Sequence, residues 1–313
     1  MPEFKILITD GLGEGGQSIL RAASHVDDKA GLSASDLLKS VVDYDALIVR
    51  GRTKVTGDVF EAGKKLKVIG RAGVGVDNID LEAAKKHAVI VVNAPVSTTL
   101  AVAELVFGLL LAAAREIPHA DAAMKKGEWL KKEFEGVELN GKTLGIIGFG
   151  RIGMEVGKRA AAFGMNVIAY DPFVSEDDIK ARGREPVSIQ ELYEWSDFIS
   201  LHLPLNVHTR DLISQMSLSQ MKDGVRIVSA ARGGIIDESA LLAALNSGKV
   251  ASAALDVFAT EPPGSTGLVN HPKVITTPHI GAQTVEAQTR AADDIAHEVL
   301  AALRGEPLRW KVN

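Results

Sequence analysis

The sequence predicts an α/β fold made of two doubly wound domains, each with a parallel sheet. Three observations support this prediction. Short β-branched and aliphatic runs alternate with amphipathic stretches of helical period along most of the chain. This alternation starts afresh near residue 143. At 313 residues, the chain is long enough to form two hydrophobic cores.

The first hundred residues show the alternation clearly. Apolar runs bounded by turn residues predict strands, and amphipathic stretches between them predict helices. This alternation is typical of a parallel sheet that has helices on both faces. The predicted strands are Lys5–Thr9, Ala46–Arg50, Lys67–Gly70 and Val89–Asn93, and the predicted helices are Gly15–Ala23, Asp36–Val42, Thr56–Lys64 and Leu81–His87.

A strongly apolar segment, Leu100–Arg115, predicts a long helix that ends before Pro118. Glu104 interrupts its apolar run, which is shorter than the ~18 apolar residues that a membrane span needs. We therefore expect a buried helix or a subunit interface. Since two-fold pairing is the commonest way to cover such a surface, a homodimer or homotetramer formed through this region is predicted.

The segment after residue 143 carries the most specific motif. A short apolar strand, Leu144–Ile147, runs into the glycine-rich turn Gly148–Gly153, and a helix of small residues follows. A second strand, Asn166–Tyr170, then leads to Asp171. A dinucleotide-binding βαβ unit requires this order of elements, so we predict a Rossmann domain.

Each glycine of the turn has a physical role in such a unit. Gly148 permits the tight turn, Gly150 lets the backbone approach a pyrophosphate, and Gly153 lets helix and strand pack closely. The helix N-terminus offers free N–H groups and its dipole to the phosphates. Asp171 can accept hydrogen bonds from ribose hydroxyls and would repel a 2′-phosphate, and Pro172 follows it where an NADP site would have an arginine. The predicted cofactor is NAD.

The motif lies in the middle of the chain, so a first α/β domain precedes it. The simplest topology inserts a Rossmann NAD-binding domain, residues 100–282, into a flavodoxin-like domain of residues 1–99 plus 283–313, with a ligand cleft between them. The remaining predicted elements are strands at Phe198–His202, Val225–Ala230, Ala251–Val257 and Val274–Thr277, and helices at Leu241–Asn246 and Thr284–Arg304.

The composition excludes several classes of protein. The net charge is −5 and no block of basic residues occurs, so neither nucleic acid nor a membrane surface is an expected partner. The absence of cysteine excludes disulfides, thiolate catalysis and Cys-ligated metal, and no metal site is predicted. This absence and an N-terminus that enters a strand directly fit a cytoplasmic protein.

Several sequence blocks in order resemble the D-isomer-specific 2-hydroxyacid dehydrogenases, most closely the branch that oxidises 3-phosphoglycerate. The likeness covers nearly the whole chain. With the chain ending at Asn313, the resemblance implies a short form without a regulatory domain. Besides the glycine-rich turn, the blocks are residues 70–78, 139–145, 231–237, 255–258, 261–263 and 277–282.

The resemblance implies a catalytic arginine, glutamate and histidine at Arg232, Glu261 and His279, and elementary chemistry agrees. An imidazole titrates near neutral pH, so His279 can take the proton of a substrate hydroxyl. The Glu261 carboxylate can hold the second ring nitrogen and set the tautomer. The Arg232 guanidinium suits a carboxylate and can polarise the 2-oxygen.

The resemblance also implies further cofactor contacts. The backbone and side chains of the turn would contact the pyrophosphate, and later loops would flank the adenosine and line the nicotinamide. The complete predicted cofactor set is Gly148, Gly150, Arg151, Ile152, Gly153, Asp171, Pro172, Leu203, Pro204, Thr209, Ala230, Ala231, Asp256, Gly281 and Ala282.

Three arginines of the first domain, Arg50, Arg52 and Arg71, stand where phosphoglycerate-oxidising relatives hold the substrate phosphate. Cations at one site suit a dianion, although solvated surface charge is the alternative for each of them. The loop Gly73-Val74-Gly75 would offer N–H groups to the substrate carboxylate, and Lys131 and Lys132 could contribute from a partner subunit.

The expected reaction is therefore NAD-dependent oxidation of 3-phospho-D-glycerate to 3-phosphohydroxypyruvate, the entry step of serine biosynthesis. A hydroxypyruvate or glyoxylate reductase, or another D-2-hydroxyacid dehydrogenase, is the alternative on the same scaffold. An NAD-sensing binding protein that resembles the transcriptional co-repressors of this fold is the alternative from another class.

Overall fold

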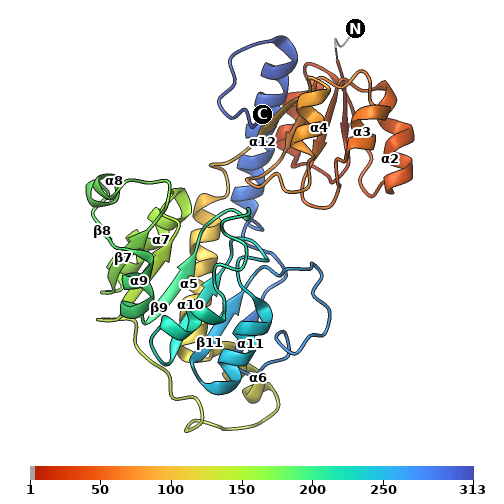
Figure 1. The fold of residues 1–313 in the computed structure, drawn as a ribbon. Coiled ribbons are helices and arrows are strands. Elements are labelled where there is room, and N and C mark those ends of the chain that lie inside the picture. The colour runs from red at the N-terminus through yellow and green to blue at the C-terminus, as the bar shows by residue number, and fades with distance from the viewer. Residues whose placement is uncertain (1–3) are drawn as a thin grey trace. The chain divides into compact units, whose positions relative to one another are not determined.

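The computed structural model describes residues 4–313, and the chain divides into two compact units (Figure 1). Unit 1 comprises Met1–Thr98 and Ala282–Asn313, and unit 2 comprises Thr99–Gly281. Both junctions lie one residue before the boundaries expected from the sequence. Each unit is a parallel sheet with helices on both faces, which confirms the predicted fold class.

The sheet of unit 1 has the order β2-β1-β3-β4-β5, and neighbouring strands are parallel. This is the flavodoxin-like order, in which the chain reverses direction between β1 and β3. β2 was not predicted because its sequence, His-Val-Asp-Asp, is polar and lies at the sheet edge. The strands are β1 (Lys5–Ile8), β2 (His25–Asp28), β3 (Ala46–Val49), β4 (Val68–Arg71) and β5 (Ile90–Asn93).

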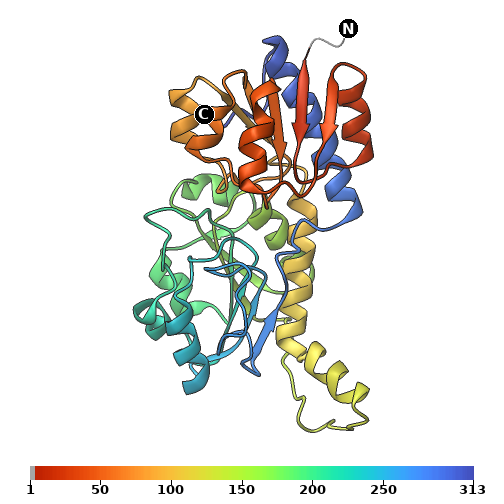
Figure 2. The same ribbon diagram turned by 90° about the vertical axis from the view of Figure 1, so that its right-hand side faces the viewer.

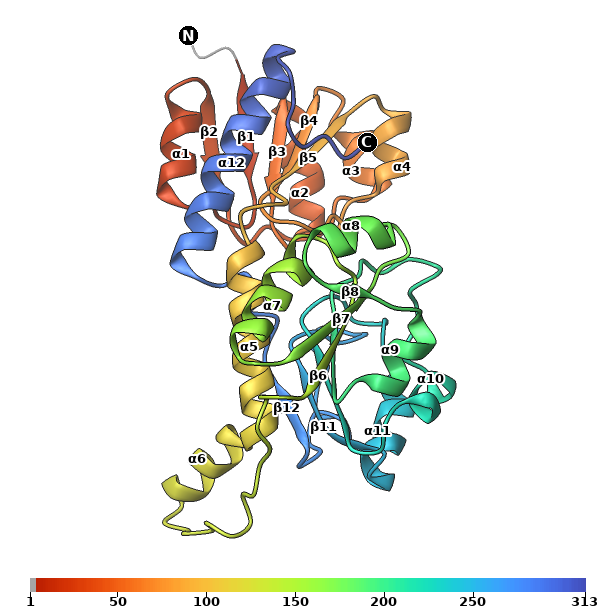
Figure 3. The ribbon, with the colours of Figure 1, turned by 90° about the vertical axis from the view of Figure 1, so that its left-hand side faces the viewer.

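Helices cover both faces of this sheet, which Figures 2 and 3 show from opposite sides. One face carries α1 (Glu14–Arg21) and α12 (Val285–Arg304), and the other carries α2 (Ala34–Ser40), α3 (Gly57–Ala62) and α4 (Leu81–Lys86), with a 3-10 turn at Val41–Asp43. α1 and α12 pack so closely that a Cβ on Gly16 would lie 2.4 Å from the carbonyl oxygen of Ala292. The C-terminal helix thus completes the core of unit 1.

The sheet of unit 2 has the order β12-β11-β10-β9-β6-β7-β8 and is also parallel. The chain reverses between β6 and β9, the position at which doubly wound sheets bind ligands beyond the carboxyl ends of their strands. The strands are β6 (Thr143–Ile147), β7 (Asn166–Tyr170), β8 (Glu185–Pro186), β9 (Phe198–Leu201), β10 (Val225–Ser229), β11 (Val250–Leu255) and β12 (Val274–Thr276).

Two helical layers enclose this second sheet (Figure 3). α5 (Thr99–Arg115), α7 (Arg151–Ala162) and α8 (Glu176–Ala181) contribute to the core of one face. α9 (Ile189–Trp195), α10 (Gln215–Gln220) and α11 (Glu238–Ser247) contribute to the core of the other.

The apolar helix α5 is packed against its own sheet, and Val106 and Leu110 are fully buried there. α6 (Ile117–Lys125) follows it after Glu116, whose backbone is left-handed, with Pro118 in its first turn. α6 and the loop after it project away from the rest of unit 2 (Figures 1 and 3). Across residues 4–313, no helix has both the length and the apolar content of a membrane span.

Candidate active site

His279 and Glu261 form a directly bonded pair at the carboxyl end of the unit 2 sheet. Nδ1 of His279 lies 2.8 Å from Oε2 of Glu261. The other carboxylate oxygen, Oε1, accepts a hydrogen bond from the backbone N–H of Phe258 at 3.1 Å. Since an ionised carboxylate only accepts, the Nδ1 atom must donate, which leaves Nε2 as the ring atom open to another molecule. Both side chains are partly exposed, as a site for a ligand requires.

The loop after β12 that carries His279 is wrapped around the buried carboxylate of Asp256. Oδ1 accepts hydrogen bonds from Thr277 Oγ1 at 2.6 Å and from Ile280 N at 2.8 Å, and Oδ2 accepts one from Gly281 N at 2.9 Å. His279 itself has a left-handed backbone, with φ at 53°. A non-glycine residue rarely adopts this conformation, so the anchored loop holds the imidazole in a specific place.

Two contacts hold the loop that carries Arg232 against the loop that presents Glu261. Gly233 lies so close to the 258 segment that an added Cβ would be 1.8 Å from the carbonyl oxygen of Phe258. Glu238 also joins the loops, because Oε1 accepts from Ala259 N at 2.7 Å. The loop that follows β10 therefore packs on the loop that presents Glu261, although the sequence predicted neither contact.

The glycine-rich turn after β6 has the geometry that its sequence predicted. Gly148 has φ of 95°, and a Cβ there would lie 2.7 Å from the carbonyl oxygen of His202. A Cβ on Gly153 would lie 2.2 Å from the carbonyl oxygen of Gly148, so α7 packs directly on the turn. By contrast, a Cβ on Gly150 would meet no atom within 4 Å. Gly150 is the N-cap of α7 and has no side chain to occupy the first N–H groups, so this end can receive an anion.

Asp171 lies against the same turn. Oδ2 accepts from Phe149 N at 2.7 Å, and Oδ1 accepts from Phe173 N at 2.8 Å. Each oxygen has a further lone pair for a ribose hydroxyl. Arg182, which the sequence analysis did not single out, donates from NH1 to the carbonyl oxygen of Phe149 at 3.0 Å and thus also supports the turn.

The residues predicted to flank adenosine and nicotinamide fall into two groups. Thr209 is buried, and its hydroxyl donates to the carbonyl oxygen of Pro204 at 2.6 Å, so it closes the 204–209 loop with its side chain. Asp256 is likewise occupied by the loop that it anchors. Exposed or partly exposed positions remain available for contact with a ligand: Arg151, Ile152, Pro172, Pro204, Ala230 and Ala282, whereas Leu203, Ala231 and Gly281 are buried.

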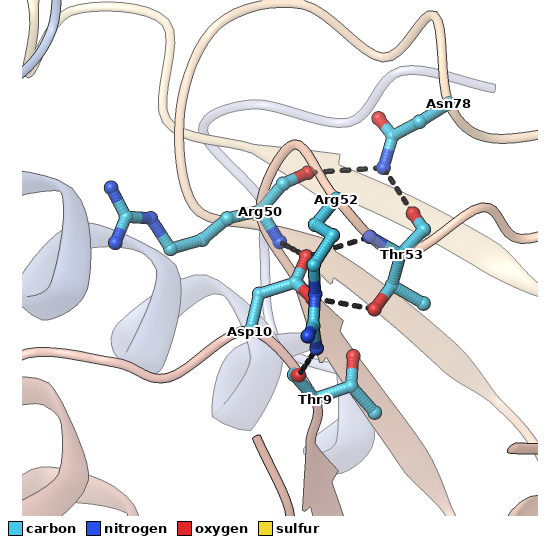
Figure 4. Close-up of polar contacts among 6 residues, drawn as sticks. All are labelled: Thr9, Asp10, Arg50, Arg52, Thr53 and Asn78. Atoms are coloured by element: carbon cyan, nitrogen blue, oxygen red, sulfur yellow. Dashed lines mark hydrogen bonds and ion pairs between the residues drawn. The ribbon is translucent and has the colours of Figure 1, made fainter. Parts of the chain in front are cut away.

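Within unit 1, Arg50 and Arg52 differ in how they are held (Figure 4). Arg52 donates from NH2 to the carbonyl oxygen of Thr9 at 2.6 Å, and from Nε and NH2 to Asp10 Oδ1 at 3.3 Å each. The Arg50 guanidinium points away from Asp10 and donates to Gln283 Oε1 at 3.0 Å. Asp10, Arg50 and Arg52 line a cavity of about 380 Å³ together with Ala30, Gly31 and Gly51.

Asp10 is charged in this cluster. Burial alone would raise the pKa of Asp10, but hydrogen bonds from Thr53, Arg50 and Arg52 outweigh burial and hold the pKa below its ordinary value. The Asp10 carboxylate therefore neutralises Arg52. Arg52 is 56% exposed and also forms an ion pair with the buried Asp10 carboxylate, so solvated surface charge remains an alternative for Arg52.

The third arginine, Arg71, ends β4 beside the loop of Gly73-Val74-Gly75. A Cβ on Gly73 would lie 1.7 Å from NH1 of Arg71, so the guanidinium packs against this glycine. The loop is fixed by Asn93, whose Nδ2 donates to the carbonyl oxygen of Val74 at 2.6 Å. The φ of 146° at position 73 favours glycine there.

Comparison with known proteins assigns the family. The sequence model described as D-isomer specific 2-hydroxyacid dehydrogenase, NAD binding domain, matches residues 107–281, which is more than half of the chain. The chain belongs to the D-isomer-specific 2-hydroxyacid dehydrogenase family. Its cofactor is accordingly NAD, and the glycine-rich turn and Asp171 of this family domain fit it.

Relatives of this dehydrogenase chain have been named or solved. A D-3-phosphoglycerate dehydrogenase of Methanocaldococcus jannaschii is 52% identical over 310 residues, covering 99% of this chain and 59% of the relative. A glyoxylate reductase from Paecilomyes thermophila superposes with a TM-score of 0.91 at 34% identity, covering 100% of this chain and 99% of that one. A D-lactate dehydrogenase from Aquifex aeolicus, complexed with NAD and lactic acid, gives 0.85 at 31%, covering 96% of each chain. The chain spans 50% to 59% of the length of these curated relatives.

Proposed function

We propose that this dehydrogenase oxidises 3-phospho-D-glycerate to 3-phosphohydroxypyruvate with NAD. The observation that carries the proposal is the bonded pair of His279 Nδ1 and Glu261 Oε2, which leaves Nε2 to act on a substrate hydroxyl. The named relative with 52% identity over nearly this whole chain supports the choice of substrate. This reaction would be the entry step of serine biosynthesis.

In this proposal, each side chain of the site has a defined task. Nε2 of His279 takes the proton of the 2-hydroxyl group as the C2–H bond breaks. Glu261 holds the tautomer in which Nε2 is unprotonated and stabilises the ring once it carries the proton. Arg232 binds the substrate carboxylate and polarises the 2-oxygen. NAD, when bound, supplies the acceptor for the hydride.

The remaining substrate and cofactor contacts follow from the two units taken separately. We assign the phosphate of the substrate to Arg50, because Asp10 neutralises Arg52. Arg71 and the loop Gly73-Val74-Gly75 would receive the carboxylate end. On the cofactor, Asp171 would accept from the ribose hydroxyls, which favours NAD over NADP.

A substrate panel tests the proposal. The full chain is assayed for NADH formation with NAD and one of three substrates: 3-phosphoglycerate, D-glycerate or D-lactate. The same assays are repeated with NADP in place of NAD, and NADPH formation is measured. We expect the highest kcat/KM with NAD and 3-phosphoglycerate. Arg50→Gln should raise the KM for 3-phosphoglycerate by roughly 10–100-fold, the effect of one lost charged contact. Better turnover of D-glycerate than of the phosphorylated substrate would reject the assignment.

A second candidate, reduction of glyoxylate or hydroxypyruvate, is favoured by one specific observation. The solved glyoxylate reductase matches this chain over its full length with a TM-score of 0.91. The same His279 would then donate a proton to the forming hydroxyl. NADH consumption with glyoxylate that exceeds turnover of 3-phosphoglycerate would favour this candidate.

We also propose that the chain forms a homodimer or homotetramer through the region of α5 and α6. Because α5 is buried in its own unit, the exposed apolar side chains that suit a partner lie mainly beyond it. Ile117 is 53% exposed, Met124 is 55% exposed and Trp129 is 77% exposed. Light scattering should give a mass of at least two chains, and Trp129→Glu should reduce it.

A further inference from the structure

Arg50 is fixed at its backbone with unusual thoroughness. The carboxylate of Asp10 accepts from the backbone N–H of Arg50 at 2.8 Å and from that of Thr53 at 3.0 Å. On the other side of the loop, Asn78 Nδ2 donates to the carbonyl oxygens of Arg50 at 3.0 Å and Thr53 at 2.7 Å (Figure 4). The loop after β3 is therefore rigid, and the direction in which the Arg50 side chain projects from this loop is fixed.

The far end of the Arg50 side chain is held as well. NH2 donates to Oε1 of Gln283, a residue 233 positions later in the chain, at 3.0 Å. Gln283 immediately precedes Thr284, which is the N-cap of the 20-residue helix α12. The positive end of the helix dipole thus lies beside the guanidinium, and both favour an anion.

The remaining donors of this pair are open to a ligand, because Gln283 is exposed and Arg50 is partly exposed. Because Oε1 of Gln283 accepts from Arg50, the amide nitrogen Nε2 carries two N–H donors next to a group that cannot accept. Within residues 4–313, Nε2 makes no hydrogen bond, and the contact with Gln283 is the one side-chain hydrogen bond of Arg50. Among the residues that line the cavity, Asp10 and Arg52 neutralise each other, so the charge that remains there is that of Arg50.

We infer that Gln283 is a specificity-determining residue, which binds the phosphate of the substrate through Nε2 while its Oε1 orients Arg50. This inference rests on the proposed function and adds a residue that the sequence blocks did not indicate. A phosphate offers oxygen acceptors to both side chains at once, whereas an unphosphorylated hydroxymethyl group offers neither the charge nor the number of acceptors.

The test compares Gln283→Leu and Gln283→Glu with the wild-type chain. Calorimetry measures binding of 3-phosphoglycerate to the full chain in the presence of NADH, and steady-state assays measure KM for 3-phosphoglycerate and for D-glycerate. Gln283→Leu should weaken 3-phosphoglycerate binding by about 10-fold, the effect of a hydrogen bond to a charged group. The KM ratio of 3-phosphoglycerate to D-glycerate should rise by about the same factor.

Gln283→Glu separates direct binding from mere support of Arg50. A carboxylate still accepts from the guanidinium but donates nothing and repels the phosphate, so this variant should bind 3-phosphoglycerate at least as weakly as Gln283→Leu. Wild-type affinity in Gln283→Glu would overturn the direct contact, and wild-type affinity in both variants would overturn the inference altogether. The exposed Gln190→Leu on α9 is the matched control and should bind normally.

Failure of the proposed function has a different signature. If the wild-type chain does not turn over 3-phosphoglycerate, the proposed reaction is wrong whatever the variants do. The inference about Gln283 is judged by binding. If the wild-type chain binds no 3-phosphoglycerate in calorimetry, the inference is overturned as well. If the wild-type chain binds 3-phosphoglycerate without turning it over, and Gln283→Leu weakens that binding, the inference is supported.

Discussion

Replacing Glu261 with glutamine tests how the imidazole of His279 is prepared for catalysis. Both carboxylate oxygens accept hydrogen bonds, one from Phe258 N at 3.1 Å and one from His279 Nδ1 at 2.8 Å. A glutamine has only one acceptor oxygen and an NH2 group that donates. It must therefore either lose the bond to Phe258 or face Nδ1 with a donor, and the second arrangement moves the ring proton to Nε2, where the base is needed.

The magnitude follows from the exposure of the pair. A hydrogen bond to a charged group is worth roughly 1.5–3 kcal/mol. Because the His279 and Glu261 side chains are 49% and 38% exposed, solvent screening favours the lower end of this range. About 1.4 kcal/mol corresponds to a tenfold change in rate, so kcat for the oxidation should fall roughly 10–50-fold.

The assay is initial-rate NADH formation under saturating NAD and substrate, with the melting temperature measured in parallel. Glu238→Gln is the matched control, since among residues 4–313 Glu238 accepts a hydrogen bond only from Ala259 N, and a glutamine can do the same. We expect Glu238→Gln to keep nearly the full rate. An unchanged kcat in Glu261→Gln, or an equal loss in both variants, would refute the tautomer argument.

Three further predictions concern the cofactor turn, the anchored loop and a histidine beside the turn. Gly150→Ala should leave the melting temperature unchanged but weaken NADH binding about 10-fold or more, whereas Gly153→Ala should lower both, because its Cβ would meet the turn at 2.2 Å. Asp256→Asn should lower the free energy of unfolding in urea by roughly 1–3 kcal/mol, because an amide cannot accept all three hydrogen bonds. Unchanged stability would show that Asp256 does not anchor the loop. Burial lowers the pKa of His202 to about 3. As the pH falls, the imidazole therefore takes up its proton in the unfolded chain before it does so in the folded chain. The corresponding stability is complete above the ordinary pKa of ~6.5 and is lost as pH falls toward 3, by up to ~1.4 kcal/mol per pH unit. The pH slope of stability between 6 and 4 should therefore be shallower in His202→Gln, and equal slopes would contradict this.

Much of the fold was accessible from the sequence because its determinants are local. Buried parallel strands such as Ala46–Val49 are continuous apolar runs, and the turn after β6 needs glycine at fixed offsets. Short polar elements gave no such signal, so the edge strands β2 and β8 were missed. The helix α6 was missed because Pro118 was interpreted as the end of a helix, whereas it occupies the first turn of the next one.

The candidate site was predictable where the resemblance to the family and elementary chemistry agree, and not where long-range contacts decide. The resemblance implied His279 and Glu261, and the need of a base for an orienting acid agreed with it. The ion pair of Arg52 with Asp10, by contrast, joins residues 42 positions apart and depends on the pairing of β1 with β3. The same limit applies to Gln283 and Arg50, whose contact depends on the return of α12 to unit 1.

The most direct test of the account is the rate of hydride transfer in a single turnover with and without the imidazole. Wild-type chain and His279→Ala, each saturated with NAD and mixed rapidly with 3-phosphoglycerate, are followed by NADH appearance. The account predicts a rate lower by roughly 10²–10⁴-fold in the variant, the usual contribution of a positioned acid–base group, with NADH affinity unchanged. Equal rates in the two proteins would contradict it.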